Sequence, residues 1–154
     1  MKKALLTLFA VFSIFFLASA QNKNDELYFA ITKNNTEKTA ALLKNGAKAS
    51  YIKSVGAWMK VSMLISAVNN KNIDIVKLLL EYKLDVNWKD GFNTTALMYA
   101  AAKGNQDMVD LLLNNGADIN ANDGTGNTVL TAAKESKNSD LIKYIEDKLK
   151  EKIK

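Results

Sequence analysis

The stretch ALMYAAAKGNQDMVDLLLNNGADIN, at residues Ala96 to Asn120, decides the fold because it recurs along the chain. Met63 to Asn87 reads MLISAVNNKNIDIVKLLLEYKLDVN, and the two final asparagines are 33 residues apart, at 87 and 120. Another copy, Glu26 to Ser50, reads ELYFAITKNNTEKTAALLKNGAKAS, and a degraded copy begins at Val129. Self-similarity at such a period indicates units that stack and bury a shared core.

The best-defined copy predicts a turn followed by two antiparallel helices. Residues 90–94 read DGFNT, and the glycine and asparagine tolerate the positive φ angles of turns. Thr95 is then a candidate N-cap for a helix over Ala96 to Lys103. A second helix over Gln106 to Asn115 carries one apolar stripe, and Gly116 follows it where helices commonly end in the left-handed conformation.

The strings A-A-x-x-G, V-x-L-L-L and G-A-D-x-N at this period resemble the ankyrin-repeat family, over most of the chain after residue 20. The resemblance implies an all-α repeat solenoid, an ankyrin-type stack of helix-turn-helix units with short hairpin tips. The family tetrapeptide T-P-L-H reads SMLI from Ser62, TALM from Thr95 and TVLT from Thr128, so its Pro and His positions are unfilled. In the family, that His helps to tie the hairpin to the helices.

The first twenty residues are expected to be a secretory signal peptide, because Lys2 and Lys3 precede an apolar run and a cleavage sequence, Ala18-Ser19-Ala20. The apolar run is shorter than the roughly 20 residues that span a membrane. We therefore expect no stable membrane anchor after cleavage, and export to the periplasm or the medium. The lysine-only basicity suggests a bacterial source. The ankyrin-repeat domain is then 21–154, with repeats at about 21–50, 51–87, 88–120 and 121–154.

Three departures from a uniform repeat are visible in the sequence. Lys83 occupies the position held by Gly46 and Gly116, so it is expected in the left-handed conformation at a cost in stability. The insertion within residues 51–61, YIKSVGAWMKV, lengthens one tip and makes it apolar. The first repeat lacks a tip and is expected to begin at Asp25 or Glu26 as a terminal cap.

Composition argues against several classes of function. The chain has no Cys and no His, which removes thiol chemistry, disulfides and the commonest general base and metal ligand. Its formal charge of +5 falls to +3 without Lys2 and Lys3. The lysines are interspersed with acidic residues, whereas a nucleic-acid-binding surface has clustered basic residues. We therefore expect no cofactor, no metal and no catalytic residues, and we expect structural roles for Asp90, Asp118 and Asp123.

Under the resemblance, the partner-binding surface consists of the hairpin tips and the concave groove. Trp58, Met59 and Phe92 fall at tip positions that the family leaves variable, and large exposed apolar groups there indicate contact. Tyr51 and Trp88 lie near the same edge. The alternative to a role in partner contact is that Trp58 and Trp88 pack beneath the enlarged tip. The groove adds four positions at the ends of the inner helices: Asn69, Asn70, Ala102 and Lys103.

The sequence thus predicts an exported, monomeric, non-enzymatic module that binds a protein. By fold-level analogy, it would serve as an accessory factor for a periplasmic or envelope protein. Three alternatives remain open: a secreted effector that binds host proteins, a small Lys- or Ser-dependent hydrolase, and a structural spacer or self-associating protein.

Overall fold

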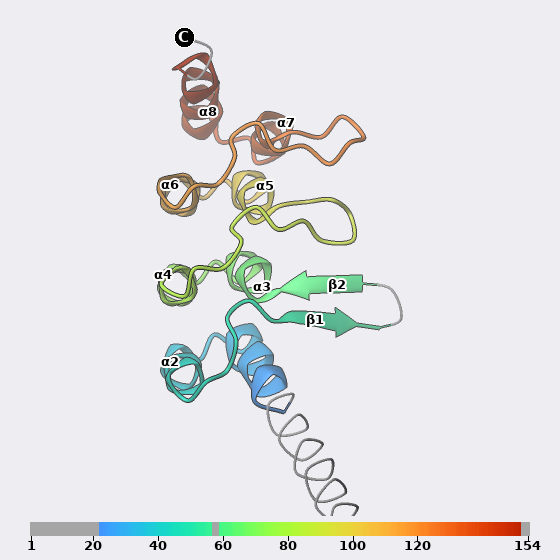
Figure 1. Ribbon diagram of the computed structural model, residues 1–154. Helices are drawn as coiled ribbons and strands as arrows, with labels where there is room; N and C mark the ends of the chain where they lie inside the picture. The colour runs from blue at the N-terminus through green and yellow to red at the C-terminus, as the bar shows by residue number, and fades with distance from the viewer. Residues whose placement is uncertain (1–21, 57–58, 152–154) are drawn as a thin grey trace, which may run out of the picture.

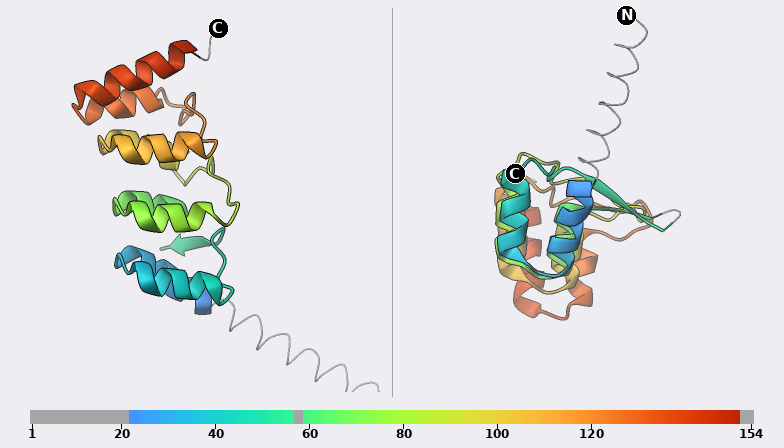
Figure 2. Two further views of the ribbon diagram at one scale, coloured as in Figure 1. Left: turned by 90° about the vertical axis from the view of Figure 1, so that its left-hand side faces the viewer. Right: turned by 90° about the horizontal axis from the view of Figure 1, so that it is seen from below.

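The chain folds into a stack of paired antiparallel helices (Figure 1). The computed structural model describes residues 22–56 and 59–151. In the two further views, one helix of each pair joins an inner column and the other joins an outer column (Figure 2). This arrangement confirms the expected helical repeat stack. In chain order, the pairs are 22–32 with α2 (Thr36–Lys44), α3 (Met63–Asn69) with α4 (Ile73–Leu80), α5 (Ala96–Ala102) with α6 (Gln106–Asn114), and α7 (Val129–Glu135) with α8 (Ser139–Glu151).

Polar caps start the short helices at a repeated position. Before each outer helix, an asparagine side chain accepts the backbone N–H of the residue three positions later; these asparagines are Asn35, Asn72, Asn105 and Asn138. Ser62, Thr95 and Thr128 do the same for α3, α5 and α7. Helices of seven to nine residues are marginal in isolation, so caps and packing between repeats stabilise them.

The outer helices α2, α4 and α6 are each followed by a residue with a positive φ angle, as the sequence predicts. The φ angles are 89° at Gly46, 48° at Lys83 and 89° at Gly116. Lys83 therefore adopts the backbone of the glycines at the equivalent positions, which confirms that it occupies a site unfavourable for a side chain.

The core runs along the stack between the two columns. Ala100 and Ala101 are at most 1% exposed, and their small side chains let α5 lie close to both α3 and α7. On the outer helices, Leu79 and Leu112 are fully buried. The neighbouring leucines of these helices are half-buried and pack against the core: Leu78, Leu80, Leu111 and Leu113.

The connections between repeats form three tips, which project to one side of the inner column (Figure 1). The first tip, residues 51–62, contains strands β1 (Ile52–Val55) and β2 (Met59–Ser62), paired antiparallel. The second tip, 88–95, is a loop, and the third, 121–128, has one isolated bridge between Asn122 and Thr128. The all-α expectation is therefore corrected: the insertion in the first tip supplies enough extended residues for a two-stranded sheet.

The N-terminal helix begins earlier than expected. Residues 22–32 are helical, whereas the sequence suggested a start at Asp25 or Glu26. Asn24 explains the difference, because it is buried and its Oδ1 accepts the Lys48 N–H at 2.8 Å. A later repeat has an equivalent bond, in which Asn87 Oδ1 accepts the Asp118 N–H at 2.8 Å. There, Asn87 belongs to the repeat that precedes the loop carrying Asp118. Asn24 thus supplies the first loop with the bond that a preceding repeat would otherwise make.

The expected signal peptide, residues 1–20, lies outside the described residues. Within 22–56 and 59–151, no helix is both long enough and apolar enough to cross a membrane.

Candidate interaction surface

The tips project at an angle to the inner helices (Figure 2), and we call the side on which the two face one another the concave face. Each inner helix presents the same positions to this face, because the repeats are in register. Counting back from the capping asparagines, one such position is held by Phe29, Ser66, Tyr99 and Ala132, and another by Thr32, Asn69, Ala102 and Glu135.

The second tip is closed by Asp90, which is 8% exposed. Its Oδ1 accepts the backbone N–H groups of Phe92 at 2.9 Å and Thr94 at 3.0 Å. Its Oδ2 accepts the Tyr99 hydroxyl at 2.7 Å, which ties the tip to α5. Burial, and next the bond to this carboxylate, raise the pKa of Tyr99 above its usual range. This bond joins tip to helix in a chain that lacks the family's histidine.

The third tip is closed in the same way by Asp123, 33 residues further on. Its carboxylate accepts the backbone N–H and the hydroxyl of Thr125, at 2.8 and 2.9 Å, and the side-chain amide of Asn127 at 2.6 Å. The backbone bond from Thr125, with further bonds from Asn127, lowers the pKa of Asp123 to about 2. The expected structural roles of Asp90 and Asp123 are confirmed by these bonds, and Asp118 Oδ1 likewise accepts the Asn120 N–H.

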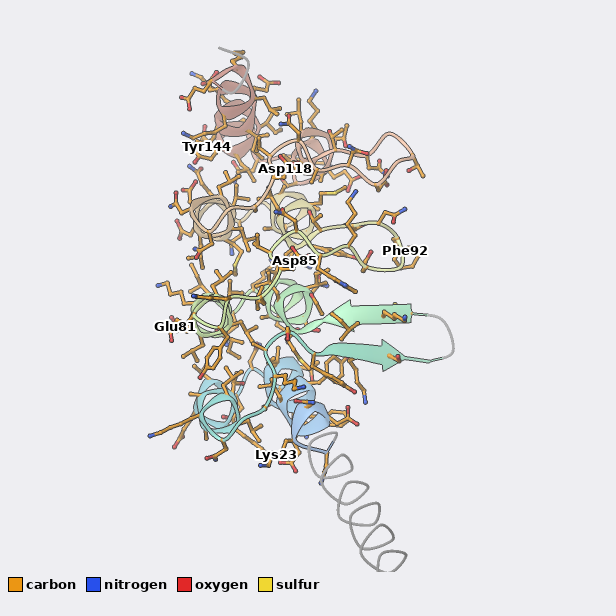
Figure 3. All side chains as sticks on the ribbon, in the orientation of Figure 1. Lys23, Glu81, Asp85, Phe92, Asp118 and Tyr144 are labelled. Atoms are coloured by element: carbon orange, nitrogen blue, oxygen red, sulfur yellow. The ribbon has the colours of Figure 1, made fainter. Side chains whose placement is uncertain are left out.

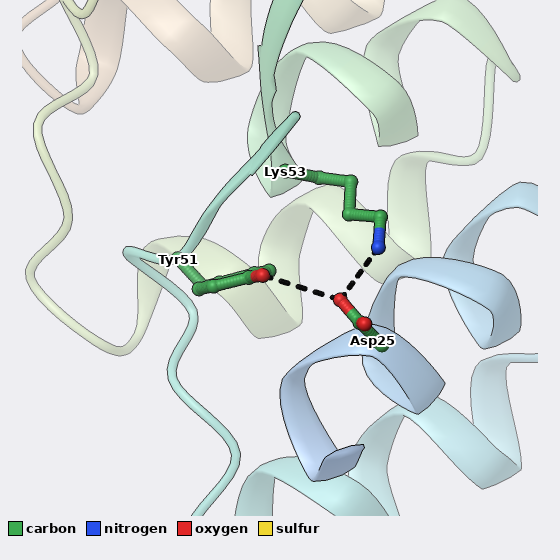
Figure 4. Close-up of polar contacts among 3 residues, drawn as sticks. All are labelled: Asp25, Tyr51 and Lys53. Atoms are coloured by element: carbon green, nitrogen blue, oxygen red, sulfur yellow. Dashed lines mark hydrogen bonds and ion pairs between the residues drawn. The ribbon is translucent and has the colours of Figure 1, made fainter. Parts of the chain in front are cut away.

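The first tip is fixed to the N-terminal helix by three polar side chains (Figure 4). Asp25 Oδ1 accepts the Lys53 ammonium at 2.7 Å and the Tyr51 hydroxyl at 3.2 Å. The bond to Asp25 is the main reason that the pKa of Lys53 is raised. The Lys53 Nζ also lies 6.0 Å from the centre of the Phe29 ring, within cation–π range. Strand β1 is therefore held over the helix by charge and by ring contact together.

The predicted tip residues have different surroundings. Phe92 is 55% exposed at the end of the second tip, where Figure 3 shows it on the side away from the outer helices. Met59 opens β2 opposite Val55 and is half-buried. Trp58 lies outside the described residues. An aromatic side chain exposed to this extent on a projecting loop is available to a partner.

The other predicted contact residues are mostly engaged within the fold. Tyr51 bonds to Asp25, and Trp88 packs against the core beside a small cavity of 50 Å³ beneath the first tip. Asn70 donates to the Ile31 carbonyl at 2.9 Å, which links two inner helices. Asn69 is exposed, and Lys103 is half-buried at the end of α5.

Two aromatic residues on the concave face were not predicted. Phe29 is 54% exposed and contacts Tyr28 edge-on, while Tyr99 lies two repeats further along at the same helix position. An alignment of the inner helices would have found both, because they share one position across the repeats. They place aromatic surface on the helices as well as on the tips.

The described residues contain no group of three or more His, Cys, Asp or Glu side chains that could hold a metal ion.

Tyr144 on α8 has a pKa raised to about 12, by burial first and then by Asp110, so it stays protonated at neutral pH. Asp90 and Asp123 each accept hydrogen bonds from backbone groups of their own tips, and further side-chain bonds join the first two tips to helices. This arrangement suits a rigid contact surface.

Comparison with known proteins gives consistent matches. The family model for ankyrin repeats matches residues 64–153 in three copies. An ankyrin repeat protein of Rickettsia bellii (strain RML369-C) is 42% identical over 76 residues, covering 48% of this chain and 9% of that protein. Dauer abnormal formation protein 25 of Caenorhabditis elegans is 40% identical over 79 residues, covering 51% of this chain and 19% of that protein. The chain thus spans less than a fifth of the length of either relative.

Proposed function

Because the chain belongs to the ankyrin-repeat family, whose repeats act as protein–protein interaction modules, we propose that it binds one partner protein through its tips and concave face. The observation that carries the proposal is Phe92, exposed on a tip that Asp90 holds rigid. An exposed aromatic side chain on a loop whose backbone is already hydrogen-bonded adds little loop-ordering cost on binding, which makes it a typical anchor.

The second support is the way the tips are attached. Asp90 bonds to Tyr99 on α5, and Asp25 bonds to Lys53 on β1, so the first two tips are each joined to a helix by a side chain. A surface that is ordered before binding avoids the cost of ordering loops in the complex. The mechanism is therefore surface complementarity on a preorganised scaffold. Ankyrin repeats are generally non-catalytic, and this role requires no chemistry from the chain.

We further propose export, with the partner in the periplasm or envelope and this chain as its accessory factor. The support is the sequence of residues 1–20, with its two lysines, apolar run and Ala18-Ser19-Ala20. Fractionation of the source cell followed by N-terminal sequencing tests this part. Recovery from the envelope fraction with Gln21 as the first residue is expected. Recovery from the cytoplasm with Met1 intact would contradict it.

A cross-linked pull-down from the envelope fraction tests binding. The bait is Gln21 to Lys154, and it is run beside a Trp58→Ala/Met59→Ala/Phe92→Ala variant whose helicity is checked by circular dichroism. We expect a protein that only the unmutated bait captures. Equal capture by both baits would place the contact away from the tips, and capture by neither would contradict an envelope partner.

A further inference from the structure

A cavity of 160 Å³ opens on the concave face between the second and third tips. Its floor is apolar where Met98, Ala102 and Ala132 approach, and the Tyr99 ring adds a further wall. Its polar rim carries the carboxylates of Asp123 and Glu135. The described residues that line it include no lysine. An apolar floor beneath an anionic rim matches a long side chain that ends in a positive charge.

Glu135 is the residue that this arrangement leaves unexplained. It is exposed at the last position of α7, and among the described residues its carboxylate makes no ion pair or hydrogen bond. A negative charge at a helix C-terminus is electrostatically unfavourable. The other repeats have uncharged residues at the equivalent position: Thr32, Asn69 and Ala102. Glu81 shares the helix-end charge on the outer column, so what distinguishes Glu135 is that it lines the cavity.

The neighbouring lysine on α7 does not neutralise Glu135. Lys134 is the adjacent residue, and adjacent residues on a helix point in different directions. The equivalents of Lys134 in the earlier repeats are Ile31, Val68 and Ala101, and all three are buried. Lys134 is exposed and is not among the residues that line the cavity, whereas Glu135 is.

The second carboxylate at the rim is charged at physiological pH. Asp123 is held ionised by its bonds to Thr125 and Asn127, and its pKa of about 2 keeps it negative at any physiological pH. Asp90 adds a third negative charge close by, through its bond to the Tyr99 hydroxyl. No ion pair among the described residues involves Asp123, and the Lys89 ammonium bonds to the carbonyl of the preceding Asn122 at 2.7 Å.

We propose that this cavity binds a lysine or arginine side chain of the partner protein, with its alkyl stem on Met98, Ala102 and Ala132 and its cation between Asp123 and Glu135. The proposal rests on the protein-binding function proposed above and adds what the partner presents at this point. It assigns to Glu135 a role in selecting a basic residue.

Nuclear magnetic resonance with small probes tests the proposal without the partner. The chain from Gln21 to Lys154, which retains every described residue, is titrated with N-acetyl-arginine amide and with N-acetyl-citrulline amide. Citrulline keeps nearly the same shape and lacks the charge. We expect saturable backbone shifts centred on Tyr99, Ala132 and Glu135 with the arginine probe, and weaker binding of the citrulline probe.

Two matched variants make the result specific. Glu135→Gln should lower the affinity for the arginine probe about two- to fivefold, which is the effect expected from a solvent-exposed charge pair. Glu81→Gln should leave it unchanged, because Glu81 is also an exposed glutamate at a helix C-terminus but lies on the outer column (Figure 3). Equal binding of the two probes, shifts spread over the acidic surface, or no effect of Glu135→Gln would each overturn the proposal. Because the titration uses small probes and no partner protein, such a failure would not bear on the proposed protein-binding function. The pull-down tests that function separately.

Discussion

At the scale of single residues, backbone conformation and side-chain identity disagree at one helix end. Lys83 has a φ of 48°, whereas Gly46 and Gly116 fill the equivalent position at 89°. A side chain in this conformation brings Cβ close to the following carbonyl. The sequence identified this mismatch because the repeats provide two internal references for the position.

Replacing Lys83 with glycine should stabilise the chain by about 1 kcal/mol, because it removes this steric cost. Thermal unfolding followed by circular dichroism should show a midpoint about 4 °C higher. The reciprocal change, Gly116→Lys, is the matched control: a Cβ there would meet no atom within 4 Å, so only the backbone conformation is penalised. A Lys83→Gly variant that melts lower would show that the lysine side chain stabilises this helix end.

The ionised carboxylate of Asp123 should make the stability of the chain depend on pH in acid. Asp123 has a folded-state pKa of about 2 against an ordinary value of 3.8, so its stabilisation is present above pH 4 and is lost as the pH falls toward 2. Denaturant unfolding at a series of pH values should therefore show a shallower decline between pH 4 and 2 for Asp123→Asn than for the unmutated chain. Asn127→Ala removes a 2.6 Å bond to the carboxylate and should move the decline to higher pH. If the free energy of unfolding declined identically between pH 4 and 2 in all three proteins, the role of the Asp123 carboxylate would be refuted.

At the scale of elements, a ladder of asparagines starts the outer helices and partly links the repeats. Asn105 caps α6 with its side-chain oxygen, and Asn138 caps the start of α8 in the same way. Asn138 also donates its amide to the Gly104 carbonyl in the previous repeat at 3.1 Å. One residue type thus contributes both to the helix and to the stacking of helices.

We expect Asn105→Ala to cost about 1 kcal/mol of unfolding free energy and Asn138→Ala about 2 kcal/mol, because only the second also leaves the Gly104 carbonyl without that donor. Urea unfolding of the two variants measures the difference. Equal costs would mean that the bond between repeats adds nothing to the cap.

The first tip offers a separate element-scale test. Lys53→Met removes the ammonium from Asp25 while keeping the chain length similar, so β1 should open more often. Hydrogen exchange at the β1 and β2 amides should become about two- to fivefold faster, in line with one partly exposed ion pair. Lys60→Met on β2 is the control, because this exposed lysine makes no ion pair among the described residues. Equal exchange in both variants would show that the hairpin does not depend on the bond to Asp25.

At the scale of the whole molecule, most of the stack was predictable from its period. The helix ends in the best-defined repeat were predicted within one residue, because Thr95, Asn105 and Gly116 are local signals. The early start of the first helix was missed, since it depends on the contact between Asn24 and a loop 24 residues away. The cavity was missed for the same reason: its carboxylates come from positions 123 and 135, and only the packing of α5 against α7 places them beside Tyr99.

We expect the tips, and not the outer helices, to contact a protein. Phe92 and Tyr82 are both exposed aromatics, at 55% and 45%, and Tyr82 directly follows Glu81, which Figure 3 shows on the outer column. The most direct measurement is therefore photo-crosslinking in the source cell, with benzoyl-phenylalanine placed at position 92 in one strain and at position 82 in another. We expect a crosslinked product of defined mass from position 92 and none from position 82. A product from position 82 alone, or from neither position, would contradict this expectation.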